Sequence, residues 1–325
     1  MIEWPMDVLT RSTGESRVLR VKPKKCIGRS YLRPEGDSLV VTDENKIKIP
    51  NGEYFTENKS AGHFHVYARN SDGYYSMFGR RLGVDGQYID IYPKLKGRTP
   101  LPELPNETAV SLELVWPDFP DSSVPTAIKE CPEELRAEAF GLAIYRGESY
   151  VDIEEPYRNA RKKLIQLFGL ENLIPSIGAL YLDRRTKKAT IEGLLTSAKR
   201  HGLEGYVLKN FAYKDWWKLK GLHEADVFIT GFKISKSETY YGQVTAVEVG
   251  VYDDEGNVIP MGRVSGFKDF EKTAMTNDSH QYMNRTIRVL YQERASQGLL
   301  KHGSFESWRE DKSAKECIYA EQFGD

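Results

Sequence analysis

The feature that most restricts the fold of this chain is a change of pattern at Lys220-Gly221. Before this point, strand-like segments alternate with two segments of helical spacing. After it, short apolar runs separated by turns follow one another, which is typical of a small β-barrel. These runs are Ala225–Lys233, Gln243–Tyr252 and Val258–Phe267. The sequence therefore predicts two domains, residues 1–220 and residues 221–325.

The first domain is expected to combine helices with antiparallel strands. One predicted helix starts at Pro156 and ends before Gly169, and a second covers about Thr190–His201. We interpret Pro117–Glu134 as a polar loop and the first 50 residues as structural. Strands are predicted at Gly62–Tyr67, Tyr74–Phe78, Ala109–Trp116, Ala139–Tyr145 and Gly205–Lys209. The predicted fold class is α+β, with a β-barrel at the C-terminal end.

Size and composition indicate a folded protein without a membrane segment. The chain has 325 residues, of which 40% are hydrophobic, enough to bury a core in two domains. No apolar run approaches the roughly 18 residues that span a bilayer, and the N-terminus has no secretory pattern. The three cysteines have no paired C-x-x-C spacing, so neither disulfides nor a thiolate zinc site are supported. We expect a reducing, cytoplasmic location.

Charge is distributed unevenly along the chain. The formal net charge is −1, but residues 156–220 contain 14 Lys and Arg against five Asp and Glu, which gives 14 − 5 = +9. A local excess of this kind indicates a surface for a polyanion, because affinity for phosphate depends on where the charge lies. The alternative is that these charges only solvate helix surfaces.

Two neighbouring segments carry the strongest indication of chemistry. They are Glu204–Lys209 and Trp216–Lys220. Alternation along a strand places Lys218 and Lys220 on the same side, and two ammonium groups on one face could neutralise a phosphate. Glu204 could bring a carboxylate to the same place as a Mg²⁺ ligand.

These segments resemble the fourth and fifth motifs of the covalent nucleotidyltransferases, the superfamily of ATP-dependent DNA ligases, RNA ligases and mRNA capping enzymes. That superfamily opens its active site with Lys-x-Asp-Gly-x-Arg, and the best match is Lys59-Ser60-Ala61-Gly62-His63. Ala61 stands in place of the usual Asp. The resemblance implies that Lys59 is the nucleophile that carries the nucleotide.

Further motifs follow in the order of the superfamily. Phe78-Gly79-Arg80-Arg81 resembles its Ser-Arg element, which implies that Arg80 contacts phosphate. Ser111–Leu114 resembles the third motif, whose glutamate is Glu113, although the usual preceding Asp-Gly is replaced. Glu113 is then expected to bind the nucleotide and, with Glu204, the metal ion. Phe140 resembles the residue that stacks on adenine.

Near the C-terminus, two segments resemble the sixth motif of DNA ligases, Lys301–Phe305 and Trp308–Lys312. The resemblance implies that Arg309 and Lys312 hold the β and γ phosphates of ATP. In ligases and capping enzymes this motif lies on an oligonucleotide-binding (OB) barrel. The resemblance therefore implies an antiparallel-sheet nucleotidyltransferase domain, of the ATP-grasp-like adenylation type, in residues 1–220 and an OB-fold in residues 221–325.

The resemblance favours a compact ATP-dependent DNA ligase of viral, phage or bacterial type. Lys59 would attack the α-phosphate of ATP, with Lys218, Lys220 and Mg²⁺ (or Mn²⁺) absorbing charge, and AMP would then activate a nick in double-stranded DNA. We expect a monomer, cytoplasmic or in the host cytoplasm if viral. The alternatives are an RNA ligase or capping-type enzyme, and a non-catalytic nucleic-acid-binding relative.

Two other readings of the sequence stay open. Lys25-Cys26-Ile27-Gly28-Arg29 also resembles the nucleophile motif, but no arginine element follows it at hairpin distance. His63 and His65 lie on one side of a predicted strand and would suit zinc, although no further ligands are found nearby in the sequence.

Overall fold

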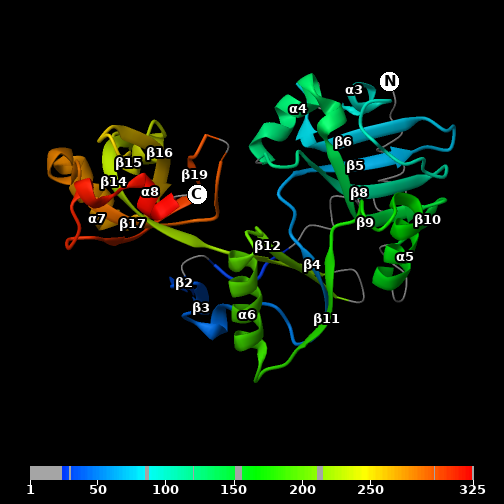
Figure 1. The fold of residues 1–325 in the computed structure, drawn as a ribbon, viewed down its shortest axis with the longest axis horizontal. Coiled ribbons are helices and arrows are strands. Elements are labelled where there is room, and N and C mark those ends of the chain that lie inside the picture. Colours follow the sequence, from blue (N-terminus) through cyan, green and yellow to red (C-terminus); the bar gives the residue numbers. More distant parts are fainter. Residues whose placement is uncertain are drawn as a thin grey trace. The chain divides into compact units, whose positions relative to one another are not determined.

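Figure 1 shows the computed structural model of the chain, which describes residues 24–28, 31–84, 88–119, 121–150, 156–210, 215–295 and 297–323. The chain divides into two compact units. The first contains residues 43–220 and the segment up to Ile27, and the second contains residues 28–42 and 221–325. The change of sequence pattern at Lys220-Gly221 coincides with one of the points where the chain passes from one unit to the other.

Residues 28–42 lie in the second unit, whereas the sequence places them in the first domain. They contain the hairpin formed by β2 (Leu32–Glu35) and β3 (Ser38–Val41). A Cβ added at Gly221 would lie 3.9 Å from the side chain of Leu39, and Arg33 is ion-paired with Glu306. These contacts join segments far apart in the sequence, which is why a linear reading of the chain misses them.

The first unit contains two sheets. The five-stranded sheet has the order β1 (Lys24–Lys25), β13 (Trp216–Lys220), β12 (Gly205–Asn210), β4 (Gly52–Asn58), β11 (Ser176–Leu182). The six-stranded sheet has the order β10 (Glu148–Ser149), β9 (Arg136–Tyr145), β8 (Thr108–Val115), β5 (His63–Arg69), β6 (Tyr75–Leu82), β7 (Tyr88–Asp90). All neighbouring strands are antiparallel except β1 and β13, which are parallel.

Helices cover parts of these sheets. The predicted helix at 156–168 is confirmed as α5 (Pro156–Phe168), whose buried residues Tyr157, Ala160, Leu164 and Phe168 recur at helical spacing and belong to the core that includes β9. The second predicted helix is confirmed as α6 (Lys187–Arg200), which packs on β12. A further short helix is α3 (Tyr92–Leu95).

The prediction that Pro117–Glu134 is a loop is wrong. This segment contains α4 (Val124–Glu130), flanked by the 3₁₀ turns η3 (Asp121–Ser123) and η4 (Pro132–Glu134). Val124, Ala127 and Ile128 are buried and lie at i, i+3 and i+4, so the helix is held by its apolar face. Its short length and polar surroundings hide this pattern in the sequence.

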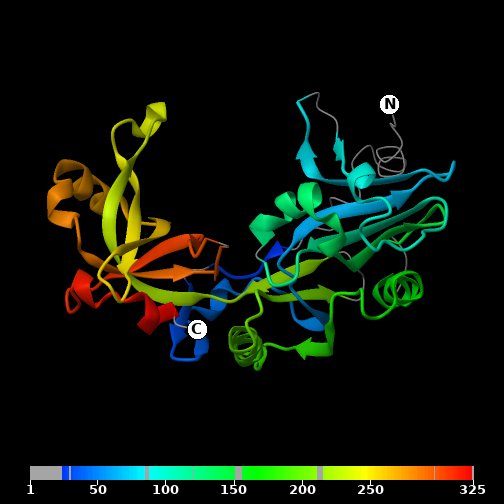
Figure 2. The same cartoon turned by 45° about the horizontal axis from the view of Figure 1, so that its top comes forward.

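The second unit contains a closed barrel with the strand order β14 (His223–Ile234), β15 (Val244–Tyr252), β16 (Val258–Ser265), β20 (Gly303–Trp308), β17 (Thr286–Tyr291). Valines on β15 at positions 247, 249 and 251 are fully buried in its core, as period-two alternation requires. Figure 2 shows the yellow-green hairpin of β14 and β15 extending beyond the rest of the barrel. The remaining elements of this unit are α7 (Asp269–Asn277), α8 (Tyr319–Phe323), β18 (Glu293–Arg294) and β19 (Leu300–Lys301).

The fold is thus a mixed, sheet-rich α and β arrangement in two units. Among the residues described, no helix is both long and apolar enough to cross a membrane.

Candidate active site

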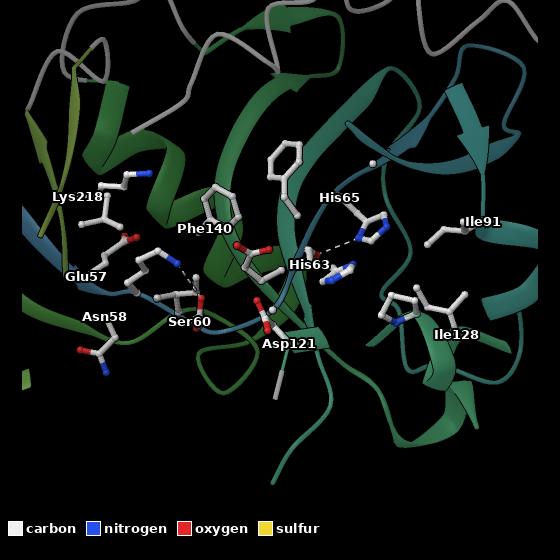
Figure 3. Close-up of a pocket in the computed structure, with 18 of the residues that line it drawn as sticks. Glu57, Asn58, Ser60, His63, His65, Ile91, Asp121, Ile128, Phe140 and Lys218 are labelled. Atoms are coloured by element: carbon white, nitrogen blue, oxygen red, sulfur yellow. Dashed lines mark hydrogen bonds between the residues drawn. The ribbon is translucent and has the colours of Figure 1, made fainter. Parts of the chain in front are cut away.

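The first unit contains a cavity of about 880 Å³. Its walls come from the end of β4 and the loop after it, from β5, β8 and β9, from β12 and β13, and from α3 and α4. Figure 3 shows Glu57 and Lys218 at one end of the cavity, Phe140 in the middle, and Ile91 and Ile128 at the other end. The predicted nucleophile Lys59 lines this cavity.

Lys59, Lys220 and Glu204 form an ion-paired group, which we call the rim cluster. The Nζ atom of Lys59 lies 2.5 Å from Oε2 of Glu204, and the Nζ atom of Lys220 lies 2.5 Å from Oε1 of the same carboxylate. The lysine side chains keep 20% and 24% of their surface exposed, respectively, whereas Glu204 keeps 7%. One carboxylate therefore holds two lysine side chains that keep part of their surface exposed.

The backbone brings these residues together by a close approach of strands. The main-chain N–H of Lys59 donates to the carbonyl of Gly205 at 2.9 Å, which fixes the loop after β4 beside β12. Gly205 has φ +145°, and a Cβ there would lie 1.9 Å from the carbonyl oxygen of Leu219. Only glycine fits at this position, so the glycine after Glu204 is needed for the rim cluster to form.

Lys218 and Lys220 both line the cavity, as alternation along β13 predicts. Glu113 on β8 and Phe140 on β9 also line it. The Phe140 ring lies 5.8 Å from that of Trp216 in an edge-on arrangement and 6.1 Å from that of Phe64. The structure therefore brings six predicted residues together in the first unit: Lys59, Glu113, Phe140, Glu204, Lys218 and Lys220.

A second ion-paired group lies deeper, and the sequence reasoning gave it no role. We call it the deep cluster: Glu57, Lys209, Arg161 and Tyr157. One oxygen of Glu57 accepts from the Tyr157 hydroxyl at 2.5 Å and from Arg161 at 2.7 Å, and the other accepts from Lys209. The exposed fractions of the Glu57 and Lys209 side chains are 2% and 1%.

Lys209 is further enclosed by the wall that carries Phe140. Its ammonium donates to the carbonyl oxygen of Phe140 at 2.6 Å and lies 4.0 Å from the centre of the Trp216 ring. Burial lowers the pKa of Lys209, while the charge of Glu57 acts in the opposite direction. The sequence does indicate Glu57 and Lys209 by their positions, because Glu57 lies two residues before Lys59 and Lys209 ends the segment that begins at Glu204.

His63 and His65 line the part of the cavity toward Ile91 and Ile128. The Nδ1 atom of His65 lies 2.9 Å from the carbonyl oxygen of His63, and burial lowers the pKa of His65 to about 4, so this ring is neutral at pH 7. Within the described residues, no group of three His, Cys, Asp or Glu side chains is placed to hold a metal ion.

Arg309 and Lys312 do not line this cavity. Arg309 and Lys312 lie in the second unit, in the segment after β20. Arg80 lies in β6, but its side chain is outside the described part of the structure. The rival Lys25 is exposed on β1 and does not line the cavity, and Arg29 lies outside the described residues.

Comparisons with known proteins identify the fold. No protein-family model and no curated protein sequence matches the chain. A solved structure named "Pmar-Lig_Pre." matches with a TM-score of 0.61 at 14% identity, over 82% of this chain and 65% of that chain. A second, "Pmar-Lig_PreS3", matches with a TM-score of 0.58 at 15% identity, over 80% and 64% of the two chains.

A third structure is described as "DNA binding with a minimal scaffold: Structure-function analysis of Lig E DNA ligases". It matches with a TM-score of 0.56 at 14% identity, over 85% of this chain and 100% of that chain. This chain thus spans less than two thirds of the first two structures and the whole of the third. At these identities the likeness shows a shared fold.

Proposed function

We propose that this chain is an ATP-dependent DNA ligase that carries AMP on Lys59 and seals nicks in duplex DNA. The observation that carries the proposal is the rim cluster, in which Lys59 and Lys220, both on the cavity wall, are ion-paired with Glu204. The fold shared with Lig E DNA ligases supports it. In this proposal the first unit is the adenylation domain and the barrel is an OB-fold.

The first step forms a bond between Nζ of Lys59 and the α-phosphorus of ATP and breaks the bond to pyrophosphate. An ammonium group has no lone pair for this attack, so it must first lose a proton. Oε2 of Glu204, 2.5 Å from Nζ of Lys59, is positioned to accept that proton. Lys218 and Lys220 then face the charge that develops on the phosphate.

Glu113 and Glu204 are the residues that we propose to hold Mg²⁺, or Mn²⁺ in its place. Mg²⁺ is usually held by one or two carboxylates together with water and the phosphates of the nucleotide. Two glutamates match this ion in the number and type of protein ligands. The ion would supply charge neutralisation on the α-phosphate.

The wall of the cavity fits a nucleotide base. Phe140 presents an aromatic ring between Phe64 and Trp216, and we propose that adenine stacks on it. After the first step, the AMP moves from Lys59 to the 5′-phosphate of the nick. The adjacent 3′-hydroxyl then attacks that phosphate and releases AMP, which closes the DNA strand.

Arg309, Lys312 and Arg80 complete the proposal. Arg309 and Lys312 hold the β and γ phosphates in the first step, which requires the barrel to come to the nucleotide and later to leave it. Arg80 contacts phosphate. We also propose a monomer that acts in the cytoplasm, which light scattering and cell fractionation would test.

The test is the mass of the intact protein after incubation with ATP and Mg²⁺. We expect an increase equal to one AMP in the wild type and in Lys25→Ala, and none in Lys59→Ala. An adduct that persists in Lys59→Ala would overturn the assignment of the nucleophile. No adduct in any variant would indicate a non-catalytic binder.

The substrate is tested on nicked duplexes with DNA or RNA at the nick. We expect sealing of the DNA nick, with an affinity that falls steeply with salt because the contacts are mainly to phosphate. Preferential sealing of RNA would favour the RNA ligase alternative. An adduct formed with GTP in place of ATP would favour capping chemistry.

A further inference from the structure

The barrel unit contains a cluster of charged residues built around Asp226 on β14. Its Oδ1 accepts from Nε of Arg288 at 3.1 Å, and its Oδ2 accepts from Arg309 at 2.5 Å and from Lys312 at 3.4 Å. We call these four residues the Asp226 cluster. The Asp226 side chain keeps only 10% of its surface exposed. One nearly buried carboxylate thus accepts hydrogen bonds from three cationic side chains.

The structure holds Asp226 in place from its backbone. Its main-chain N–H donates to the Gln322 side chain at 2.6 Å, and its carbonyl accepts from the same amide at 2.7 Å. Although burial acts to raise it, the pKa of Asp226 lies below its usual value because Arg288, Arg309 and Lys312 stabilise the ionised form. The carboxylate is therefore charged and fixed.

The cluster carries an excess of positive charge. Its four residues carry three positive charges and one negative charge. Arg309 also forms two bonds with Asp311, at 2.9 and 2.8 Å, and with Asp311 included the sum is 3 − 2 = +1. One oxygen of the Asp226 carboxylate, Oδ2, accepts from both the Arg309 guanidinium and the Lys312 ammonium group, as an oxygen of a bound phosphate would. A polyanion that reaches Arg309 and Lys312 must therefore compete with Asp226.

We propose that Asp226 is a positioning residue that stands in for phosphate: it keeps Arg288, Arg309 and Lys312 together and gives up Arg309 and Lys312 when a polyphosphate binds. Arg288 keeps Asp226 paired during the exchange. Competition from Asp226 lowers the affinity of Arg309 and Lys312 for pyrophosphate, so that this product of the first step can dissociate. The identity of the polyphosphate as ATP rests on the proposed function, whereas the exchange itself does not.

The experiment measures the binding of inorganic tripolyphosphate to the full chain by calorimetry. The binding signal that is lost in Lys312→Ala is assigned to the Asp226 cluster, and the affinity of that site is compared between variants. We expect Asp226→Asn to bind about tenfold more tightly than the wild type, because one competing charge is lost while the amide keeps the shape. Asp254→Asn removes the same charge from the exposed turn between β15 and β16 and should leave the affinity unchanged. Equal or weaker binding by Asp226→Asn would overturn the proposal, because a purely structural ion pair gives that result.

A second variant keeps the test decisive if Asp226→Asn does not fold. Arg288→Gln leaves Asp226 with Arg309 and Lys312 as its charged partners in the cluster, so the carboxylate competes harder and tripolyphosphate should bind about tenfold more weakly. Unchanged affinity in Arg288→Gln would contradict the exchange. Because tripolyphosphate cannot adenylylate Lys59, these results are independent of the AMP adduct on which the proposed function depends.

Discussion

The rim cluster and the deep cluster are built alike, yet they differ in burial. Each has one glutamate that holds two cationic side chains: Glu204 with Lys59 and Lys220, and Glu57 with Lys209 and Arg161. The lysines of the rim cluster are 20% and 24% exposed, whereas Lys209 is 1% exposed. The lysines of the rim cluster are therefore more accessible to water and ligands than Lys209.

This difference in burial suits the rim cluster to a chemical role and the deep cluster to a structural one. A buried ion pair loses much free energy if one partner is removed, because the remaining charge has no solvent to stabilise it. Lys209 is thus committed to Glu57 and to the carbonyl of Phe140, and it fixes the wall of the cavity. Lys59 and Lys220 are partly solvated, so replacing Glu204 by phosphate oxygens costs them less free energy than separating Lys209 from Glu57 would.

The largest expected effect tests whether the rim cluster is sufficient for the first step. Lys312→Ala should abolish adenylylation of Lys59, because the leaving pyrophosphate then loses one of the two cationic side chains of the barrel, Arg309 and Lys312, that are proposed to hold it. Sealing of a nick that already carries AMP should continue. Intact mass and gel-based sealing assays measure the two steps separately, with Lys315→Ala as a control. Loss of both steps would contradict a role confined to the first.

The next effect probes the deep cluster. Glu57→Gln should lower the free energy of unfolding by about 3 to 5 kcal/mol, because it leaves Lys209 and Arg161 without their carboxylate. Urea denaturation measures this loss, and Glu53→Gln, exposed on the same strand, serves as the control. A loss below about 1 kcal/mol would mean that the deep cluster is not a structural support.

Glu204→Gln makes the matching change in the rim cluster. We expect the rate of adenylylation to fall by about 10² to 10³-fold, because an amide cannot take the proton of Lys59. The loss of stability should be smaller than for Glu57→Gln, since Lys59 and Lys220 remain partly solvated. The exposed Glu171→Gln is the control. A normal rate combined with a large loss of stability would reverse the roles assigned to the two clusters.

The smallest expected effect is the pH dependence of stability that comes from the buried His65. Burial lowers the pKa of His65 to about 4, whereas an ordinary histidine titrates near 6.5. Between these values the unfolded chain binds a proton that the folded chain does not, so the free energy of unfolding falls as pH falls. Its contribution is fully present above pH 6.5 and decreases by about 2 kcal/mol between pH 6.5 and pH 4.5.

Denaturation of the wild type and of His65→Gln across this range measures that contribution. The stability of His65→Gln should depend less on pH than that of the wild type. Identical pH dependence in His65→Gln and the wild type would show that burial does not keep His65 neutral.

Local patterns in the sequence predicted the elements well where periodicity and stop signals agree. The helix 156–168 is such a case, with Pro at its first residue and Gly169 after its last. Alternation in Trp216–Lys220 correctly placed Lys218 and Lys220 on the cavity wall. The short helix α4 escaped prediction because three buried residues in a polar segment give too weak a pattern.

The sequence by itself determined which residue types carry charge, where helices α5 and α6 and several strands form, and the order of the motifs from Lys59 to Lys312. The tertiary structure decided which charges share a carboxylate. Glu57 meets Lys209 and Arg161 across 152 and 104 positions, and Asp226 meets Lys312 across 86. Such pairings depend on strand register and burial, because ionised groups removed from water are stable only beside a partner, and the fold brings these partners together.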